Sequence, residues 1–294
     1  MYYIGCMDVL EVFDLSKSFG TKEVLKNLNF SLKQGEIFGF LGPNGAGKTT
    51  TINCLMGFIY PDTGSIKIFS KNIKNNIVEI KKKISYGSSS DILNMNWTVS
   101  DHINFVYSFK KPSEYDKNII KSLDISLNSR IKTLSYGNRQ KVSLLLSLIC
   151  NPQIIILDEP SRGLDPLYQS IFHSLILDIK KRGVSIFLSS HDLQEVGDVC
   201  DRIGIIKEGM LVDIEGIDEV KKKKIYSVII KFKEKYNIKD FENLEIVDNT
   251  KNSIKVKVKT DINSFIKIIS KYDIENLLVE PISLEDTFLE FYKK

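Results

Sequence analysis

A glycine-rich segment, GPNGAGKTT at positions 42–50, carries residue types that bind phosphate groups. Its glycines allow the backbone to curl, so that successive amide N–H groups face one point. Lys48 adds a positive charge, and the Thr49 hydroxyl can ligate Mg²⁺. The apolar stretch 36–41 precedes the segment and a helical pattern follows it, which is the context of a strand–loop–helix phosphate site. We assign phosphate binding to this set: Gly42, Asn44, Gly45, Ala46, Gly47, Lys48, Thr49 and Thr50.

An acidic pair, Asp158 and Glu159, directly follows the apolar run 154–157. Four consecutive apolar residues are typical of a central parallel strand, and open α/β sheets bind ligands at the carboxyl ends of their strands. We expect Asp158 to hold Mg²⁺ directly or through water, and Glu159 to polarise an attacking water as general base. A glutamate that only caps or pairs locally is the competing interpretation, and the phosphate loop upstream argues against it.

The elements that must position these residues alternate between strands and helices. We expect strands at 9–14, 28–32 and 36–41, a helix to about Gly57, a strand at 65–69, a mostly helical stretch at 88–150, and compact strands at 154–157, 184–188 and 202–206. This alternation predicts an α/β domain with a largely parallel sheet.

The composition shifts near Gly216, where a second domain is expected to begin. Apolar residues and lysines alternate over 254–259, which predicts a half-buried strand. Asp261 can cap a helix whose apolar stripe is Ile262, Phe265, Ile266 and Ile269. Further strands are expected at 226–232, 244–247 and 276–279, with a last helix capped by Ser283. We therefore divide the chain into domains 1–218 and 219–294, with a helical subdomain at about 88–150.

The composition excludes several classes of protein. The chain has 294 residues, of which 41 are basic and 37 acidic, and this excess is too small to indicate nucleic acid as a partner. No apolar run approaches the ~18 residues that a membrane span requires, and the N-terminus reaches acidic residues too early for a secretory signal. The cysteines are too widely spaced for a zinc site or a disulfide framework, which fits a reducing cytosol: Cys6, Cys54, Cys150 and Cys200.

Three more motifs stand in a fixed order with the first two: LSYGNRQ at 134–140, SRGLD at 161–165 and SSHD at 189–192. With all five motifs, the chain resembles the ATP-binding-cassette (ABC) ATPases over about residues 8–216. The resemblance implies an α/β fold: a P-loop ABC ATPase domain with a mixed sheet core and a helical subdomain, followed here by a small α+β C-terminal domain. It implies ATP and Mg²⁺ as the bound ligands.

The resemblance also implies roles for single residues. His191 matches the switch histidine that contacts the γ-phosphate, and Asp165 matches the aspartate that communicates across a dimer. Phe19, in KSFG, matches the aromatic residue that stacks on adenine, although an aromatic residue near a strand can also be part of the core. Ser135 and Gly137 match the signature loop, whose hydroxyl and amide face the γ-phosphate bound to the other subunit.

Two motifs depart from the family pattern, at three positions. Tyr136 stands where the signature loop has its first glycine, and Asn138 where it has a glutamine. After the strand KKISY, a serine, aligned as Ser89, replaces a glutamine that in the family touches Mg²⁺ and the attacking water. Either a water bridges the shorter side chain, or hydrolysis is slower and coupling to the membrane partner is altered. The sequence leaves both explanations open.

The function that the resemblance favours is the ATPase subunit of a bacterial exporter. The segment between Lys48 and Ser135 is too short for the coiled coil of chromosome-binding relatives. The chain has one cassette rather than two, and no zinc module. Its closing segment, PISLEDTFLEFY at 281–292, resembles the tail of drug and bacteriocin export ATPases of bacteria.

We expect two copies to clamp two Mg-ATP molecules head to tail as a homodimer on the cytoplasmic face of the membrane. Separate transmembrane permease subunits would dock near residues 87–110 and choose the transported substrate, and no nucleic acid is expected to bind. One competing function is a nucleotide-dependent regulatory module with little ATP turnover. Another is a soluble kinase of small molecules.

Overall fold

The computed structural model describes residues 7–88, 93–222, 226–258 and 262–281. The chain divides into two compact units, Met1–Ile217 and Asp218–Lys294, which we call the larger and the smaller unit. Ser89, Asp261, Ser283 and most of the closing segment 281–292 lie outside the described residues.

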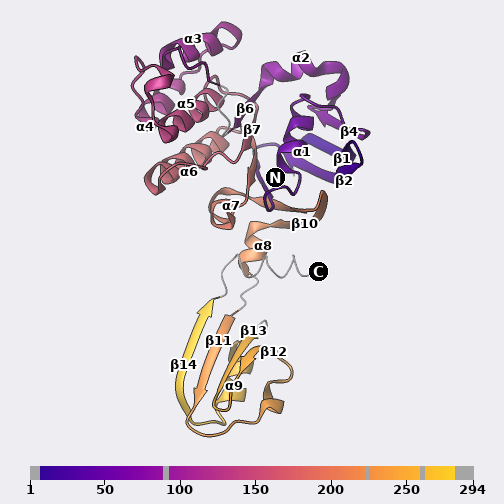
Figure 1. Ribbon diagram of the computed structural model, residues 1–294, viewed down its shortest axis with the longest axis vertical. Helices are drawn as coiled ribbons and strands as arrows, with labels where there is room; N and C mark the ends of the chain where they lie inside the picture. Colours follow the sequence, from indigo (N-terminus) through magenta and orange to yellow (C-terminus); the bar gives the residue numbers. More distant parts are fainter. Residues whose placement is uncertain (1–6, 89–92, 223–225, 259–261, 282–294) are drawn as a thin grey trace, which may run out of the picture. The chain divides into compact units, whose positions relative to one another are not determined.

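The main sheet of the larger unit has six strands in the order β10-β9-β3-β8-β7-β6 (Figure 1). Five of them run parallel, and only β10 pairs in an antiparallel way, with β9. Every residue of β3 and β7 is buried, as expected for central strands that are covered on both faces. Their bounds are β3 (Ile37–Leu41), β6 (Ile84–Ser88), β7 (Ile154–Asp158), β8 (Ser185–Ser190), β9 (Arg202–Lys207) and β10 (Met210–Gly216).

A second sheet in the larger unit is antiparallel, in the order β2-β1-β4-β5. Its strands are β1 (Asp8–Phe19), β2 (Lys22–Lys33), β4 (Thr63–Ile68) and β5 (Lys71–Asn72). β1 and β2 extend well beyond the predicted strands at 9–14 and 28–32 and form a long hairpin, whose turn includes Gly20 at φ 60°. The largely parallel sheet is therefore joined by a wholly antiparallel one, which makes the unit a mixed α/β fold.

Aromatic rings fill the core between these two sheets. Phe30 of β2 packs against Phe38, Phe40 and Phe187 of the main sheet, with ring centroids 5.5–5.8 Å apart. All four side chains are buried. This packing fixes the β1–β2 hairpin against the strands that lead into the phosphate loop.

The helices of the larger unit alternate with strands as the sequence predicts, and α2 lies where no helix was predicted. The mostly helical stretch predicted at 88–150 contains α3, α4 and α5, which lie together on one side of the main sheet (Figure 1). A reciprocal capping box of Thr98 and Asp101 begins α3. The bounds are α1 (Lys48–Leu55), α2 (Ile73–Lys83), α3 (Val99–Phe109), α4 (Asp116–Leu123), η1 (Ile131–Thr133), α5 (Tyr136–Leu148), α6 (Pro166–Lys181) and α7 (Leu193–Val199).

The smaller unit is a four-stranded antiparallel sheet, in the order β12-β13-β11-β14, with α9 packed on it. The predicted alternation is confirmed, because Ile254, Val256 and Val258 are fully buried. In α9, Phe265 is buried as expected, whereas Ile266 is 49% exposed, so its place in the apolar stripe was wrong. The bounds are α8 (Ile217–Lys222), β11 (Tyr226–Phe232), η2 (Ile238–Phe241), β12 (Glu245–Asn249), β13 (Ser253–Val258), α9 (Ile262–Ile269) and β14 (Ile274–Pro281).

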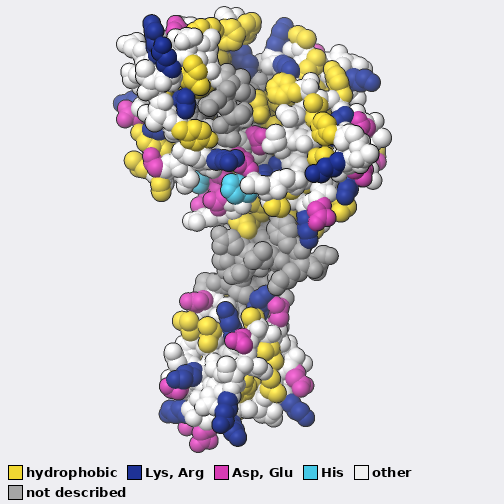
Figure 2. All heavy atoms as spheres, viewed as in Figure 1, with side chains coloured by type: hydrophobic (Ala, Val, Ile, Leu, Met, Phe, Trp, Pro, Cys, Tyr) yellow, Lys and Arg dark blue, Asp and Glu magenta, His cyan; other side chains and the backbone are white. Residues whose placement is uncertain are grey.

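Basic and acidic side chains are mixed on the face of the smaller unit seen in Figure 2. Lys231 pairs with Glu275 at 2.7 Å and Lys257 with Glu245 at 3.0 Å, so two of its lysines have acidic partners. Within the described part of the chain, no helix combines the length and the apolar character needed to cross a membrane.

Candidate active site

Three of the sequence motifs meet because the strands before them are neighbours. β8 pairs in parallel with β3 on one side and β7 on the other. The register places Ser190 beside Leu41, and Ser189 beside Asp158. The phosphate loop, the acidic pair and the SSHD motif therefore all begin at the same edge of the sheet.

The phosphate loop ends at Gly47, directly before α1. Gly47 has φ 111°, a left-handed value, and a Cβ at this position would lie 2.7 Å from a methyl carbon of Leu25. Both the dihedral angle and the lack of space favour glycine. The helix that follows presents unpaired amide groups and the positive end of its dipole to the loop, which makes an anion site.

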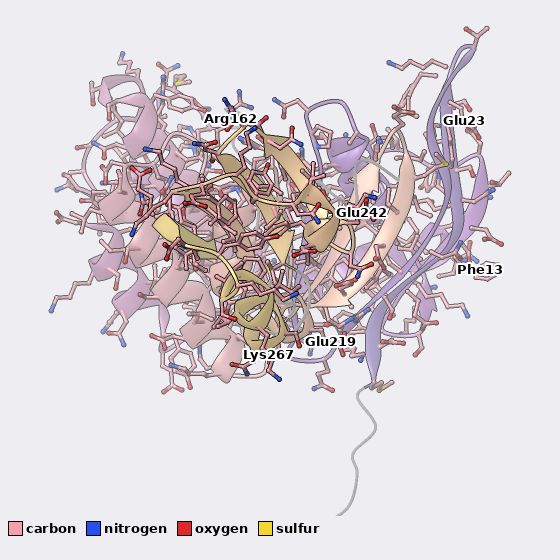
Figure 3. All side chains as sticks on the ribbon, turned by 90° about the horizontal axis from the view of Figure 1, so that it is seen from below. Phe13, Glu23, Arg162, Glu219, Glu242 and Lys267 are labelled. Atoms are coloured by element: carbon pink, nitrogen blue, oxygen red, sulfur yellow. The ribbon has the colours of Figure 1, made fainter. Side chains whose placement is uncertain are left out.

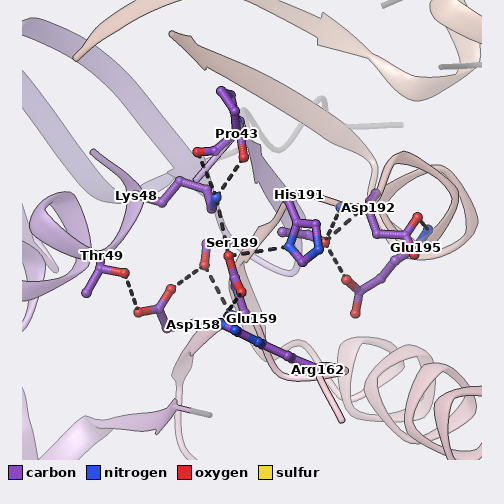
Figure 4. Close-up of polar contacts among 12 residues, drawn as sticks. Pro43, Lys48, Thr49, Asp158, Glu159, Arg162, Ser189, His191, Asp192 and Glu195 are labelled. Atoms are coloured by element: carbon purple, nitrogen blue, oxygen red, sulfur yellow. Dashed lines mark hydrogen bonds and ion pairs between the residues drawn. The ribbon is translucent and has the colours of Figure 1, made fainter. Parts of the chain in front are cut away.

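Lys48, the first residue of α1, lies between the loop and the acidic pair. Its side chain is 5% exposed, and Nζ donates a 2.6 Å hydrogen bond to the Gly42 carbonyl oxygen. Nζ also lies 3.3 Å from Glu159 Oε1 (Figure 4). The buried ammonium is thus already paired with a carboxylate at the carboxyl end of β7.

Asp158 lies next to Thr49, the other residue that the sequence predicts as a Mg²⁺ ligand. Its Oδ2 accepts a hydrogen bond of 3.0 Å from Thr49 Oγ1, and its Oδ1 accepts one of 2.6 Å from Ser189 Oγ. A hydroxyl and a single carboxylate are hard oxygen ligands, which suit a magnesium ion that takes its other ligands from phosphates and water. The donor set therefore fits the predicted Mg²⁺.

Glu159 stands at the centre of the polar contacts drawn in Figure 4. Its backbone has φ 48°, an unusual value for a non-glycine residue, and its amide donates to the Ser189 carbonyl oxygen at 3.1 Å. Besides Lys48, its carboxylate lies 3.4 Å from Arg162 Nη1 and 3.4 Å from His191 Nδ1. Three nitrogen-bearing side chains thus converge on one carboxylate.

A cleft of about 390 Å³ opens over these residues. Most of the predicted phosphate-binding and acidic residues line it, whereas Gly42 and the buried Ala46 stay within the loop. Three lining residues had no predicted role: Lys22, Val24 and Arg162. The complete lining is Lys22, Val24, Asn44, Gly45, Gly47, Lys48, Thr49, Thr50, Asp158, Glu159 and Arg162.

Phe19 and His191 lie outside this lining. His191 reaches the site through Glu159, and its side chain is half exposed. Phe19 is 52% exposed at the end of β1, next to the hairpin turn that leads to the lining residue Lys22. Lys17 Nζ lies 5.6 Å from the centre of its ring.

The residues with an expected role across a dimer are not among those that line the cleft. Ser135 caps the N-terminus of α5, where its hydroxyl accepts a hydrogen bond from the Asn138 amide at 3.3 Å. Asp165 caps α6 in the same way, accepting from the Tyr168 amide at 3.1 Å. Gly137 lies in the first turn of α5. Each motif is therefore placed at the start of a helix.

Glu195 is a buried carboxylate to which the sequence gave no role. It is 4% exposed, and its Oε2 accepts a 2.6 Å hydrogen bond from Ser190 Oγ. The same hydroxyl accepts the Asp192 amide at 2.9 Å. Burial raises the pKa of the Glu195 carboxyl above its ordinary value. These contacts hold the turn that carries His191.

Neither a protein-only metal cluster nor a disulfide is found in the described ranges. No group of three His, Cys, Asp or Glu side chains there could hold a metal ion. The cysteines described, Cys54, Cys150 and Cys200, are thiols.

Comparison with known proteins gives consistent matches. The family model described as ABC transporter matches residues 25–162. The bacitracin transport ATP-binding protein BcrA of Bacillus licheniformis is 36% identical over 225 residues, 73% of this chain and 72% of that protein. The Nod factor export ATP-binding protein I of Rhizobium johnstonii is 32% identical over 208 residues, 68% of this chain and 67% of that protein. A solved structure of the ATP-binding subunit of an ABC transporter has a TM-score of 0.68 at 27% identity, and the match covers 73% of this chain and 92% of that one.

Proposed function

The chain belongs to the ATP-binding proteins of the ABC transporter family, which are ATPases, and on this premise we propose that it hydrolyses ATP to drive a bacterial exporter. One observation carries the proposal. The first two residues of α1 both reach the acidic pair after β7, Lys48 at 3.3 Å from Glu159 and Thr49 at 3.0 Å from Asp158. The names of two relatives, one for bacitracin transport and one for Nod factor export, favour export of a substrate.

ATP binding would change the partner of Lys48. A phosphate chain in the cleft carries more negative charge than one carboxylate, and the amides of the loop and of α1 add to its attraction. We expect Lys48 to turn from Glu159 and from the Gly42 carbonyl toward the phosphates. Lys22 and Val24 line the same cleft from β2, and they support placing the nucleoside near the hairpin turn, where Phe19 would stack on adenine.

Hydrolysis would then use the carboxylate that Lys48 releases. Glu159 could accept a proton from a water that attacks the γ-phosphate, and the convergence of His191 and Arg162 on it would hold its orientation. Thr49 and Asp158 would hold Mg²⁺, which neutralises charge on the transferred phosphoryl group. Ser189 fixes both acidic residues, since its hydroxyl donates to Asp158 and accepts the Glu159 amide.

A second copy of the chain would complete each nucleotide site. Ser135 and Gly137 lie at the start of α5 and outside the lining of the cleft, which supports a role toward the nucleotide of another molecule. We propose a head-to-tail homodimer, with Asp165 communicating between the two sites. The dimer would sit on the cytoplasmic face of the membrane, held by separate permease subunits.

An aromatic cluster supports the docking region predicted near residues 87–110. Phe105 and Phe109 are 51% and 73% exposed, and their ring centroids are 5.1 Å apart. Trp97 packs on Phe105 at 5.4 Å. Exposed apolar side chains that gather in one place are typical of an interaction surface. We propose that a permease subunit covers this cluster.

The test is the ATPase activity of the purified full chain with and without Mg²⁺. We expect Lys48→Ala to abolish activity together with ATP binding, because the buried ammonium is the main charge facing the phosphates. Glu159→Gln should keep ATP binding and lower kcat by at least ~100-fold, the size of a general-base contribution. Lys67→Ala and Glu114→Gln, which change exposed side chains of the same types, are the controls.

Three outcomes would contradict the proposal or parts of it. Hydrolysis by Glu159→Gln at the wild-type rate would show that Glu159 is not the base. ATP binding without turnover, even with the membrane partner present, would favour the regulatory module. A phosphorylated small-molecule product would instead indicate a kinase.

A further inference from the structure

The side chain of Tyr136 lies against Gly163, in the short connector 159–165 between β7 and α6. A Cβ on Gly163 would clash with Tyr136 Cε1 and lie 2.9 Å from its Cδ1, so the ring rests directly on the glycine. Gly163 also has φ 80°, which favours glycine for a separate reason. The Tyr136 ring therefore packs on a position that only glycine can occupy without strain.

Two further contacts join the same helix turn to the same connector. A Cβ on Gly137 would be 3.2 Å from the Gly163 carbonyl oxygen, so the two backbones approach closely. One turn further along α5, Gln140 is 4% exposed, and its Nε2 donates to the Pro160 carbonyl oxygen at 3.1 Å. The start of α5 therefore holds the connector at two separate residues.

A fourth contact joins α5 to the helix that follows the connector. Lys141 is 7% exposed, and its Nζ lies 2.9 Å from the centre of the Tyr168 ring in α6. A cation over an aromatic face is attracted by the ring electrons, and more strongly when it is desolvated. The first two turns of α5 are thus fastened both to the connector and to the element at its far end.

The connector also contacts Glu159, so a change in its position affects an acidic residue that lines the cleft. Arg162 precedes Gly163 directly and places Nη1 3.4 Å from Glu159 Oε2. The turn is closed by hydrogen bonds from the Arg162 amide to the Glu159 carbonyl oxygen, 3.2 Å, and from the Leu164 amide to the Ser161 carbonyl oxygen, 3.0 Å. A displacement at Gly163 would move Arg162, and with it a partner of the Glu159 carboxylate.

We propose that Tyr136 is a positioning residue that fastens the start of α5 to this connector and so keeps Ser135 and Glu159 at a fixed spacing. The inference rests on the proposed function, in which Ser135 serves the nucleotide of the second copy and Glu159 that of its own copy. Tyr136 then connects Ser135, which would contact the nucleotide bound to the partner, with Glu159, the proposed general base of the protomer's own site. It supplies a contact that the glycine expected in the signature loop could not make.

The contact itself is tested by a double-mutant cycle in the full chain, which needs no ATPase activity. Gly163→Ala should lower the Tm through both the clash with the ring and the left-handed φ. In the Tyr136→Ala background only the φ strain is left, so the Tm loss should be at most half as large. With Tyr136→Phe the loss should match that with tyrosine, because ring carbons make the contact. Equal losses in all three backgrounds would overturn the proposal.

Hydrogen exchange gives a second measure if a Gly163 variant fails to fold. Alanine is a better helix former than tyrosine, so Tyr136→Ala does not weaken α5 by propensity. We expect amides of both 137–141 and 161–164 to exchange at least fivefold faster in this variant. Phe13→Ala is the matched control, because Phe13 is 63% exposed and points away from its sheet (Figure 3). Faster exchange confined to residues 137–141 would contradict a link between α5 and the connector.

The positioning role is tested by steady-state ATPase kinetics. Tyr136→Ala should lower kcat at least fivefold with less than a twofold change in KM, because the cleft still binds ATP while Glu159 is less well held. Tyr136→Phe should restore kcat, and Phe13→Ala should leave it unchanged. A wild-type kcat in Tyr136→Ala would overturn the role. An inactive wild-type chain would instead contradict the proposed function, and the cycle and exchange data would still decide whether the contact exists.

Discussion

At the residue scale, the carboxylates of Asp158 and Glu159, at the end of β7, and of Glu195, in α7, differ in how they are paired. Asp158 and Glu159 each have at least two polar partners, including Thr49 and Lys48. Glu195 has one oxygen bound to Ser190, while its other oxygen has no hydrogen-bond partner among the described residues. Burial disfavours the charged carboxylate, which is the main cause of the raised pKa of Glu195, and the hydrogen bond from Ser190 opposes it only in part.

Glu195 should make the stability of the larger unit depend on pH. A carboxyl whose pKa is raised in the folded state keeps its proton where the unfolded chain has lost it. The contribution of Glu195 to the free energy of unfolding is therefore most favourable at low pH and falls as the pH rises above the ordinary glutamate value of 4.5. Glu195→Gln removes this loss, so the Tm of the variant should fall less between pH 5 and pH 8 than that of the wild type.

Thermal unfolding at several pH values checks this expectation, with the exposed Glu114→Gln as control. The Tm of the control should change with pH in the same way as the Tm of the wild type. Parallel curves for Glu195→Gln as well would show that the buried carboxyl does not titrate with folding.

At the element scale, the site depends on which strands are neighbours and how closely helices approach them. The order β3-β8-β7 brings three loops to one edge, although their motifs are far apart in the chain. α7, which follows His191, packs on β3 at Gly39, where a Cβ would lie 2.6 Å from Val196 Cγ1 and 2.8 Å from Cys200 Sγ. The absence of a side chain at Gly39 therefore sets the distance between strand and helix.

Gly39→Ala should destabilise the larger unit by ~1–3 kcal/mol, the usual cost of overpacking a core. It should also lower ATPase activity, because a displaced α7 moves the turn that carries His191. Denaturant unfolding and kcat measure the two effects. In a Val196→Ala background the nearest clash is removed, so Gly39→Ala should lower the free energy of unfolding by a measurably smaller amount. An undiminished cost would mean that the strain lies elsewhere.

At the scale of the whole molecule, each unit has a hydrophobic core of its own. Phe232, Phe241 and Phe265 are buried in the smaller unit, and all residues that line the cleft belong to the larger one. Two independent cores predict two separable unfolding transitions.

Phe241→Ala should lower the unfolding temperature of the smaller unit only. Removing a fully buried phenylalanine costs ~3–5 kcal/mol, which is a large fraction of the stability of a small domain. The Kd for ATP should change less than twofold. Phe187→Ala, the matched change in the core of the larger unit, should lower the other transition. Calorimetry with ATP-binding titrations measures both, and a loss of ATP binding in Phe241→Ala would show that the units are coupled.

The sequence by itself determined the features that consecutive residues build. A phosphate loop is made from the backbone of neighbouring residues, so GPNGAGKTT specified it together with Lys48 and Thr49. The strand in 254–259 likewise follows from the period of two in its side chains. The order of five motifs was enough to indicate the ABC ATPases, and the comparisons confirm that family.

Only the tertiary structure decided which distant side chains meet. Lys22 and Val24 carry no motif, and they line the cleft because the β1–β2 hairpin is longer than its apolar pattern indicated. Ile266 lies off the helix stripe because one further residue turns a side chain by about 100° around an α-helix. The contact of Tyr136 with Gly163 depends on how α5 packs against the connector after β7. Packing between segments far apart in the chain leaves no local pattern, because each partner is set by the fold rather than by its sequence neighbours.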